Sequence, residues 1–316
     1  MSGGQPALPR IVRRGMAEAM NHPAPPPEAA PSAEPAILGP AVLFVSAAHG
    51  RALAKAPTLP ADALVYDLED AVAPDAKGAA REALRDAVRA RRPAMPFAVR
   101  INPPGTPHFT EDLLAARTLA PHAIVVPKVE GPGDLGVVHD ALAETDAPET
   151  LKLWAMVETP RGVLDIAAVA GFGGRLEALI AGTNDLIAMT GVSVAGGRAP
   201  LRPWLSQIVL AARANGLVAL DGVRNDWRDT AALEAEAREG AMLGFDGKTL
   251  IHPDQIAPTR AGFAPDPSEL ERARAVVAAF ERVGEGVGIV TIGGRMVERL
   301  HLAAARRLLA RNGEQP

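Results

Sequence analysis

Two carboxylates, Glu158 and Asp185, each follow a short apolar run with the length and composition of a buried strand. If these runs are neighbouring strands of a parallel sheet, the two side chains can converge on one cation. Coordination by oxygen alone suits Mg²⁺, which typically takes one or two protein carboxylates and keeps positions for water and substrate. The pair therefore indicates a magnesium site. The alternative is that each carboxylate caps the following helix, since helices are expected to begin near Pro160 and Leu186.

Arg100 lies at the end of another apolar run, at 97–101. Its planar guanidinium can bind a carboxylate or a developing enolate oxygen through two parallel hydrogen bonds. We therefore predict that Arg100 binds substrate and takes part in catalysis. The alternative is a salt bridge to Glu69 or Asp70, which follow the run at 63–68, and both interpretations can hold together.

Lys128 follows the run at 123–126 and is one of only five lysines in the chain. A lysine at the end of a strand raises the possibility of a Schiff-base aldolase. The acids expected around Lys128 would keep its amine protonated, which makes it a poor nucleophile.

These residues require a scaffold that brings the ends of many strands to one place. Strand-like runs alternate with amphipathic segments such as 76–92, where Ala80, Leu84 and Val88 recur at helical spacing. Eight such units in about 210 residues predict a (β/α)₈ TIM barrel, in which active sites lie at the carboxyl ends of the strands. The expected strands are 42–46, 63–68, 97–101, 123–126, 153–157, 178–181, 217–220 and 244–248.

The two ends of the chain differ from the barrel. Residues 1–40 are rich in proline and alanine without apolar periodicity, which predicts a disordered arm before a catalytic barrel at 41–262. Residues 263–316 are expected to form a small C-terminal extension. It would hold a helix at 267–281 capped by Ser268, a strand at 287–292 and a helix at 297–310.

Composition narrows the possible functions of the 316 residues. There are 33 lysines and arginines against 37 aspartates and glutamates, a net charge of −4, so we expect neither nucleic acid nor a membrane surface as a partner. The absence of cysteine excludes a thiol nucleophile and a thiolate metal site. No apolar run approaches the ~18 residues of a membrane span, and we expect a cytoplasmic protein.

Several short motifs occur in a fixed order along the predicted barrel. They are DLEDAV at 67–72, VRIN at 99–102, VPKVE at 126–130, VET at 157–159, GTNDL at 182–186, GFDGK at 244–248 and IHP at 251–253. Together they resemble the citrate lyase β-subunit-like family. This family is the CoA-ester lyase branch of the HpcH/HpaI aldolase superfamily and includes malyl-CoA and citramalyl-CoA lyases. The resemblance extends from about residue 42 to residue 307.

The resemblance implies a barrel enzyme with a C-terminal extension that forms a homotrimer or homohexamer. Such enzymes use Mg²⁺ to cleave a 3-hydroxyacyl-CoA into an acyl-CoA and a 2-oxoacid, or to run the reverse condensation. Carried over to this chain, Glu158 and Asp185 would be the metal ligands, with Glu158 also next to the substrate. Arg100 would hold the carboxylate or carbonyl of the 2-oxoacid. Glu69, Asp70 and Lys128 would surround the site, the two acids contacting the metal through water.

Two segments depart from the family's pattern. The family has a catalytic aspartate in a Met-(Ile/Val)-Asp-x-Pro segment that reaches the site of a neighbouring subunit. The corresponding segment here is MVERL at 296–300, so the resemblance implies that Glu298 takes the acid or base role and that the extension packs on a neighbouring subunit. The alternative is an exposed glutamate on a helix. The loop after the first strand, SAAHGR at 46–51, replaces the usual Pro-Gly turn, and we expect a different CoA-facing loop.

Three further functions stay open beside the lyase. The same scaffold could hydrolyse the thioester of a malyl-CoA-like substrate. It could also be the β subunit of a citrate-lyase-type complex that accepts substrate on a carrier protein. A CoA-free class II aldolase is disfavoured, because the motifs follow the CoA branch.

Overall fold

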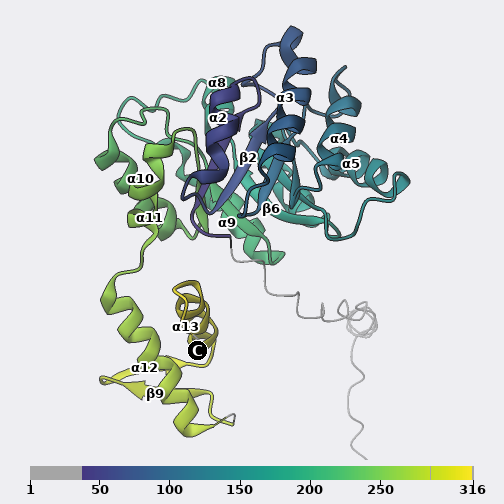
Figure 1. The fold of residues 1–316 in the computed structure, drawn as a ribbon. Coiled ribbons are helices and arrows are strands. Elements are labelled where there is room, and N and C mark those ends of the chain that lie inside the picture. Colours follow the sequence, from purple (N-terminus) through teal and green to yellow (C-terminus); the bar gives the residue numbers. More distant parts are fainter. Residues whose placement is uncertain (1–37, 285, 315–316) are drawn as a thin grey trace, which may run out of the picture. The chain divides into compact units, whose positions relative to one another are not determined.

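The computed structural model describes residues 38–284 and 286–314. Eight parallel strands form a closed barrel in which each strand pairs with the next and the eighth pairs with the first (Figure 1). The predicted (β/α)₈ barrel is therefore confirmed. The strands are β1 Ala41–Ser46, β2 Ala63–Asp67, β3 Phe97–Arg100, β4 Ala123–Val126, β5 Lys152–Val157, β6 Leu176–Ala181, β7 Val218–Asp221 and β8 Gly247–Leu250.

Helices surround the strands (Figure 1). The segment expected to be helical at 76–92 is α3, and its buried side chains include the predicted Ala80, Leu84 and Val88. The helices of this part are α2 Gly50–Lys55, α3 Lys77–Ala90, α4 Phe109–Thr118, α5 Pro132–Glu144, α6 Pro160–Leu164, α7 Ile166–Ala170, α8 Thr183–Thr190, α9 Arg202–Ala214, α10 Thr230–Leu243 and α11 Ile256–Phe263. Short 3₁₀ turns lie at Ala56–Thr58, Pro74–Ala76, Ala199–Leu201 and Pro253–Gln255.

Alternation along the strands decides which side chains reach the barrel interior. In β2, Val65 packs inside the barrel, while Leu64 packs outward against the helices. Ala98 of β3 and Trp154 of β5 also lie inside. Side chains two or four positions further along the same strands therefore also point inward, at the carboxyl ends of the strands. Asp67, Arg100 and Glu158 stand at these positions, so their side chains point into the same end of the barrel.

The last strand of the barrel begins three residues later in the sequence than predicted. The sequence suggested a strand at 244–248, but β8 is Gly247–Leu250. Gly244 has a φ of +98° and caps the end of α10, a left-handed conformation that glycine adopts readily. The start of the apolar run therefore belongs to the helix cap.

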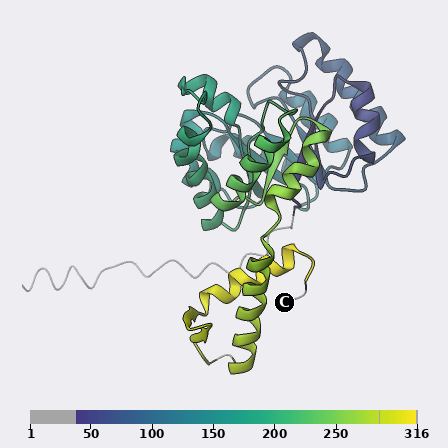
Figure 2. The same ribbon diagram turned by 90° about the vertical axis from the view of Figure 1, so that its left-hand side faces the viewer.

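The C-terminal extension has a hydrophobic cluster of its own. It consists of α12 Pro267–Val283, the antiparallel strands β9 Ile289–Ile292 and β10 Arg295–Glu298, and α13 Leu300–Arg311 (Figure 2). Phe280, Val290 and Leu309 are buried in this cluster.

Two expectations for this extension were wrong. Asp266, not Ser268, caps α12, because its carboxylate accepts the backbone N–H of Ser268 at 2.8 Å. The helix expected at 297–310 begins only at Leu300, since Arg295–Glu298 pairs with β9 instead. Glu298 therefore ends a strand, and its interpretation as a helical glutamate is wrong.

Two further sequence expectations concern the chain ends and membranes. The predicted disordered arm at 1–40 falls almost wholly outside the described residues. Within residues 38–284 and 286–314, none of the helices combines the length and apolar character needed to cross a bilayer.

Candidate active site

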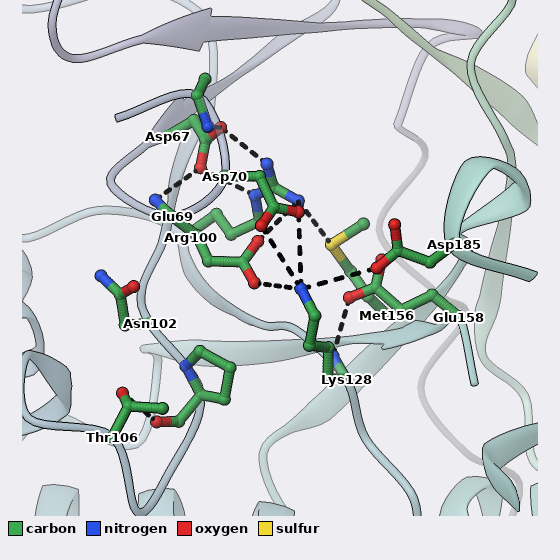
Figure 3. A network of polar contacts seen from close by, with 12 residues as sticks. Asp67, Glu69, Asp70, Arg100, Asn102, Thr106, Lys128, Met156, Glu158 and Asp185 are labelled. Carbon is green, nitrogen blue, oxygen red and sulfur yellow. Dashed lines mark hydrogen bonds and ion pairs between the residues drawn. The ribbon is translucent and has the colours of Figure 1, made fainter. Parts of the chain in front are cut away.

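Arg100 is held at the barrel rim by Asp67 (Figure 3). Its Nε lies 2.8 Å from Asp67 Oδ1, and its Nη2 lies 2.6 Å from Asp67 Oδ2. The pair forms across the sheet, because Asp67 and Arg100 are register partners at the ends of β2 and β3. This bidentate bond fixes the guanidinium plane and leaves Nη1 directed toward Glu69 and Met156, at 3.0 Å and 3.7 Å.

Glu69 lies between the two cations of the site. Its Oε1 is 2.5 Å from Lys128 Nζ, and its Oε2 is 3.0 Å from Arg100 Nη1. Oε2 is buried and finds no aligned hydrogen-bond donor among the described residues. Asp70 is more exposed and lies 3.4 Å from Lys128 Nζ. The predicted salt bridge of Arg100 with Glu69 is therefore present, but Asp67 is its stronger partner.

Lys128 adopts an unusual backbone conformation. Its φ is +52°, a left-handed geometry that costs a residue other than glycine about 1–3 kcal/mol. In this conformation the backbone N–H donates to Glu158 Oε1 at 2.8 Å, and the ammonium lies among Glu69, Asp70 and Asp185. Through its backbone N–H and its ammonium, Lys128 thus contacts four carboxylates (Figure 3).

Glu158 and Asp185 approach each other from neighbouring strand ends. Glu158 is 2% exposed, and Asp185 Oδ2 lies 3.5 Å from Lys128 Nζ. Neither caps a helix, because Thr159 caps α6 and Gly182 caps α8. A Cβ on Gly182 would overlap the Glu158 side chain, so glycine is required beside it.

Burial and neighbouring charges shift the pKa values of three groups at the site. Burial, followed by the charge of Glu69, raises the pKa of Glu158 to about 7. Burial also raises the pKa of Glu69. For Lys128, burial lowers the pKa, but the hydrogen bond and the charge of Glu69 outweigh this and raise it above its ordinary value. This direction agrees with the expectation that Lys128 stays protonated.

A cavity of about 410 Å³ opens at this end of the barrel. One side carries charge, from Asp67, Asp70, Arg100, Glu158 and Asp185. Residues in or just after β7, β8 and β1 also line the cavity: Val223, Thr249, Ile251 and Phe44. The cavity can therefore hold a ligand with an anionic end and a less polar remainder.

The donor set fits a hard divalent cation. Five carboxylates, from Asp67, Glu69, Asp70, Glu158 and Asp185, surround only two cationic side chains. No group of three or more His, Cys, Asp or Glu in the described residues is arranged to hold a metal by itself. Two carboxylate ligands completed by water and substrate oxygens match the usual protein site of Mg²⁺.

The structure brings together six of the seven candidate residues. These are Glu69, Asp70, Arg100, Lys128, Glu158 and Asp185. Glu298 is not among them: of the described residues that line the cavity, none lies beyond Ile251 in the sequence.

Two residues of the site had no role assigned from the sequence. Asp67 lies in the DLEDAV motif at a strand end, but only the register of β2 and β3 shows that it pairs with Arg100. Met156 could not be predicted as a site residue, because a methionine in an apolar run is expected to pack in the hydrophobic core.

The fold is a (β/α)₈ barrel, and its cavity at the carboxyl rim holds clustered acids and an oriented arginine. These features are typical of a metal-dependent (β/α)₈-barrel enzyme. The family model described as HpcH/HpaI aldolase/citrate lyase matches residues 40–253. A (3S)-malyl-CoA thioesterase from Cereibacter sphaeroides is 41% identical over 272 residues, covering 85% of this chain and 93% of that protein. The mitochondrial citramalyl-CoA lyase of Homo sapiens is 33% identical over 278 residues, covering 82% and 81%.

A solved structure is similar over nearly the same length. Protein CitE from Mycobacterium tuberculosis, in complex with magnesium, acetoacetate and coenzyme A, has a TM-score of 0.73 and 37% identity, covering 88% of this chain and 99% of that one. The chain belongs to the HpcH/HpaI aldolase/citrate lyase family. It is an enzyme, and its relatives include a CoA-ester lyase and a CoA-ester thioesterase.

Proposed function

We propose that this protein is a Mg²⁺-dependent lyase that cleaves or forms a 3-hydroxyacyl-CoA such as malyl-CoA or citramalyl-CoA. The products of cleavage are an acyl-CoA and a 2-oxoacid. The observation that carries this proposal is the placement of Glu158 and Asp185 beside the oriented guanidinium of Arg100 in one cavity. The magnesium, acetoacetate and coenzyme A bound by the similar CitE structure support the same ligand classes.

Glu158 and Asp185 would hold the metal. When bound, Mg²⁺ supplies a Lewis acid that polarises the oxygens of the 2-oxoacid portion. Burial next to Glu69 disfavours the ionised form of Glu158 despite Arg100 and Lys128, and a metal ion would offset this. Glu69 and Asp70 would orient water molecules around the ion. Oε2 of Glu69 accepts no hydrogen bond from the described residues, so it is suited to accept one from such a water molecule.

Arg100 would bind the substrate carboxylate or carbonyl through Nη1. Asp67 already occupies Nε and Nη2, so the guanidinium needs no reorientation when the substrate enters. During cleavage, negative charge moves onto an enolate oxygen, and a preorganised donor of this kind contributes about 3–4 kcal/mol to transition-state stabilisation. Lys128 adds a second positive charge, which its ion pair with Glu69 holds in place.

The proton carrier would come from the C-terminal extension of a neighbouring subunit. Glu298 lies opposite Ile289 in the β9–β10 hairpin, and Met296 lies opposite Thr291. Ile289 and Met296 are 52% and 71% exposed, so this face combines a carboxylate with apolar side chains. Such a face suits packing on another subunit, and we propose a homotrimer or homohexamer.

Thioester hydrolysis is the second candidate. It is favoured by the 41% identity with a (3S)-malyl-CoA thioesterase. The same carboxylates and Arg100 could hold malyl-CoA while water attacks the thioester carbonyl. A β-subunit role in a citrate-lyase-type complex is the third, since another similar structure is the citrate lyase beta subunit of Mycobacterium tuberculosis with oxaloacetate and magnesium.

Product analysis distinguishes these functions. Malyl-CoA, methylmalyl-CoA and citramalyl-CoA are incubated with enzyme and Mg²⁺, and the products are separated by liquid chromatography and mass spectrometry. Acyl-CoA plus a 2-oxoacid supports the lyase. Free CoA plus the intact hydroxyacid would replace it with the thioesterase. Turnover only with a co-purifying carrier protein would replace it with the complex subunit.

A further inference from the structure

Lys77 is a buried lysine behind the active site. It is the first residue of α3, is 7% exposed, and directs its ammonium away from solvent. Its Nζ donates to the carbonyl oxygens of Leu68 and Glu69, at 3.0 Å and 2.9 Å. Within the described part of the chain, no carboxylate lies within 4.0 Å of this ammonium.

We propose that Lys77 is a positioning residue of the active site that locks the turn at 67–71 and so sets the direction of the Glu69 and Asp70 side chains. The inference rests on the proposed function for its effect on metal binding. Its effect on the turn itself does not depend on that function.

The turn is held by side chains on both of its faces. Asp67 accepts the backbone N–H groups of Glu69 and Ala71, at 2.8 Å and 3.2 Å. Asn102 donates to the Leu68 carbonyl at 3.0 Å, which gives that oxygen a second donor beside Lys77. Asp67 therefore fixes the N–H groups, while Lys77 binds two successive carbonyls.

A lysine at this position is unfavourable unless it has a specific role. A buried ammonium loses its hydration, and two neutral carbonyls offset this less than a carboxylate would. A positive charge in the first turn of a helix also opposes the helix dipole. A leucine or methionine would carry neither penalty, so the charge points to the two bonds that only a donor can make.

The direction of Glu69 depends on these bonds. Its carboxylate bridges Arg100 and Lys128, at 3.0 Å and 2.5 Å. A rotation of the Leu68–Glu69 peptide would withdraw this carboxylate from one cation or both. Partners that orient the groups around a metal typically contribute 10–100-fold to metal affinity or activity.

The test compares Lys77→Met with wild type and with Lys152→Met. Methionine keeps most of the side-chain volume without the charge, and Lys152 begins β5 at the opposite end of the barrel. Three quantities are measured: Mg²⁺ affinity by calorimetry, kcat and KM with malyl-CoA, and hydrogen exchange of the peptide at 67–73. We expect Lys77→Met to weaken Mg²⁺ binding and lower kcat by about 10–100-fold, with KM changed less, and to accelerate exchange at 67–73. Lys152→Met should match wild type.

Chemical rescue separates positioning from general damage to the fold. Because the chain contains no cysteine, Lys77→Cys can be alkylated at one position with 2-bromoethylamine in denaturant and refolded. Wild type taken through the same treatment is the reference. The aminoethyl product restores an ammonium of nearly lysine length, so it should recover most of the Mg²⁺ affinity, whereas a neutral propyl adduct should not.

Wild-type Mg²⁺ affinity, kcat and exchange in Lys77→Met would overturn the role of Lys77 and leave the proposed function intact. Equal loss in the aminoethyl and propyl products would also overturn it. If wild type neither binds Mg²⁺ nor turns over a CoA ester, the proposed function fails, and exchange at 67–73 alone decides the role of Lys77.

Discussion

Replacing Glu158 with glutamine isolates the effect of burying this carboxylate. Burial and the charge of Glu69 raise the pKa of Glu158 from 4.5 to about 7. One pKa unit corresponds to about 1.4 kcal/mol. The unfolded chain releases this proton near pH 4.5, while the folded protein retains it until about pH 7. Rising pH across this window therefore removes about 3 kcal/mol of unfolding free energy from the metal-free wild type.

Glutamine has no proton to release, and its Oε1 can still accept the N–H of Lys128. In EDTA, we expect Glu158→Gln to become more stable than wild type between pH 5 and pH 8, by up to ~3 kcal/mol at pH 8. Saturating Mg²⁺ should stabilise wild type at pH 8 and leave the variant unchanged. Guanidinium denaturation at pH 5, 6, 7 and 8 measures both effects.

The exposed Glu144 supplies the control, since Glu144→Gln should show no such trend. A stability difference between Glu158→Gln and wild type that stays constant from pH 5 to pH 8 would show that burial does not raise the pKa of Glu158. A Mg²⁺-dependent stabilisation of the variant equal to that of wild type would refute the assignment of Glu158 as a ligand.

Three other substitutions test separate parts of the site. Asp67→Asn keeps one hydrogen-bond acceptor but loses the negative charge, so the Arg100 guanidinium becomes free to tilt. We expect kcat/KM to fall by about 10–100-fold. An unchanged kcat/KM would mean that Arg100 is oriented without Asp67. Gly182→Ala places a methyl against Glu158 and should weaken Mg²⁺ binding in calorimetry, with ~1–3 kcal/mol lost in stability. Wild-type Mg²⁺ affinity in that variant would show that Glu158 can move without loss. Glu298→Gln should lower kcat by about 10²–10⁴-fold if this carboxylate transfers the proton. Wild-type kcat would make Glu298 an ordinary surface residue.

The barrel could be predicted because its signals are local. Each strand is a short apolar run, and helices such as α3 show their buried face at a spacing of three to four residues. The polar residues that follow the runs then converge, because parallel strands of a barrel end at one rim. Glu158, Asp185 and Arg100 are predictable in this way.

The partners of these residues could not be predicted in the same way, since they depend on register and on helix placement. Asp67 faces Arg100 only because β2 and β3 align these two positions. Lys77 shares the face of α3 that carries Ala80 and Leu84, but only the packed structure shows which carbonyl oxygens its ammonium reaches.

The error at Glu298 has a different cause. Gly293 and Gly294 both have positive φ values, of +55° and +76°, and form the tight turn between β9 and β10. A Gly-Gly pair between apolar runs is a hairpin signal, and it outweighs the helical periodicity that follows. This signal was in the sequence, so the hairpin carrying Glu298 could have been predicted.

We propose that Glu158, Asp185 and their metal carry out carbon–carbon cleavage of a CoA ester. The most direct test is a time course of glyoxylate and acetyl-CoA released from malyl-CoA, first with Mg²⁺, then after chelation, then after Mg²⁺ is restored. We predict equimolar release of both products, arrest on chelation and recovery on restoration. Undiminished release of both products in the presence of chelator would contradict metal-dependent cleavage.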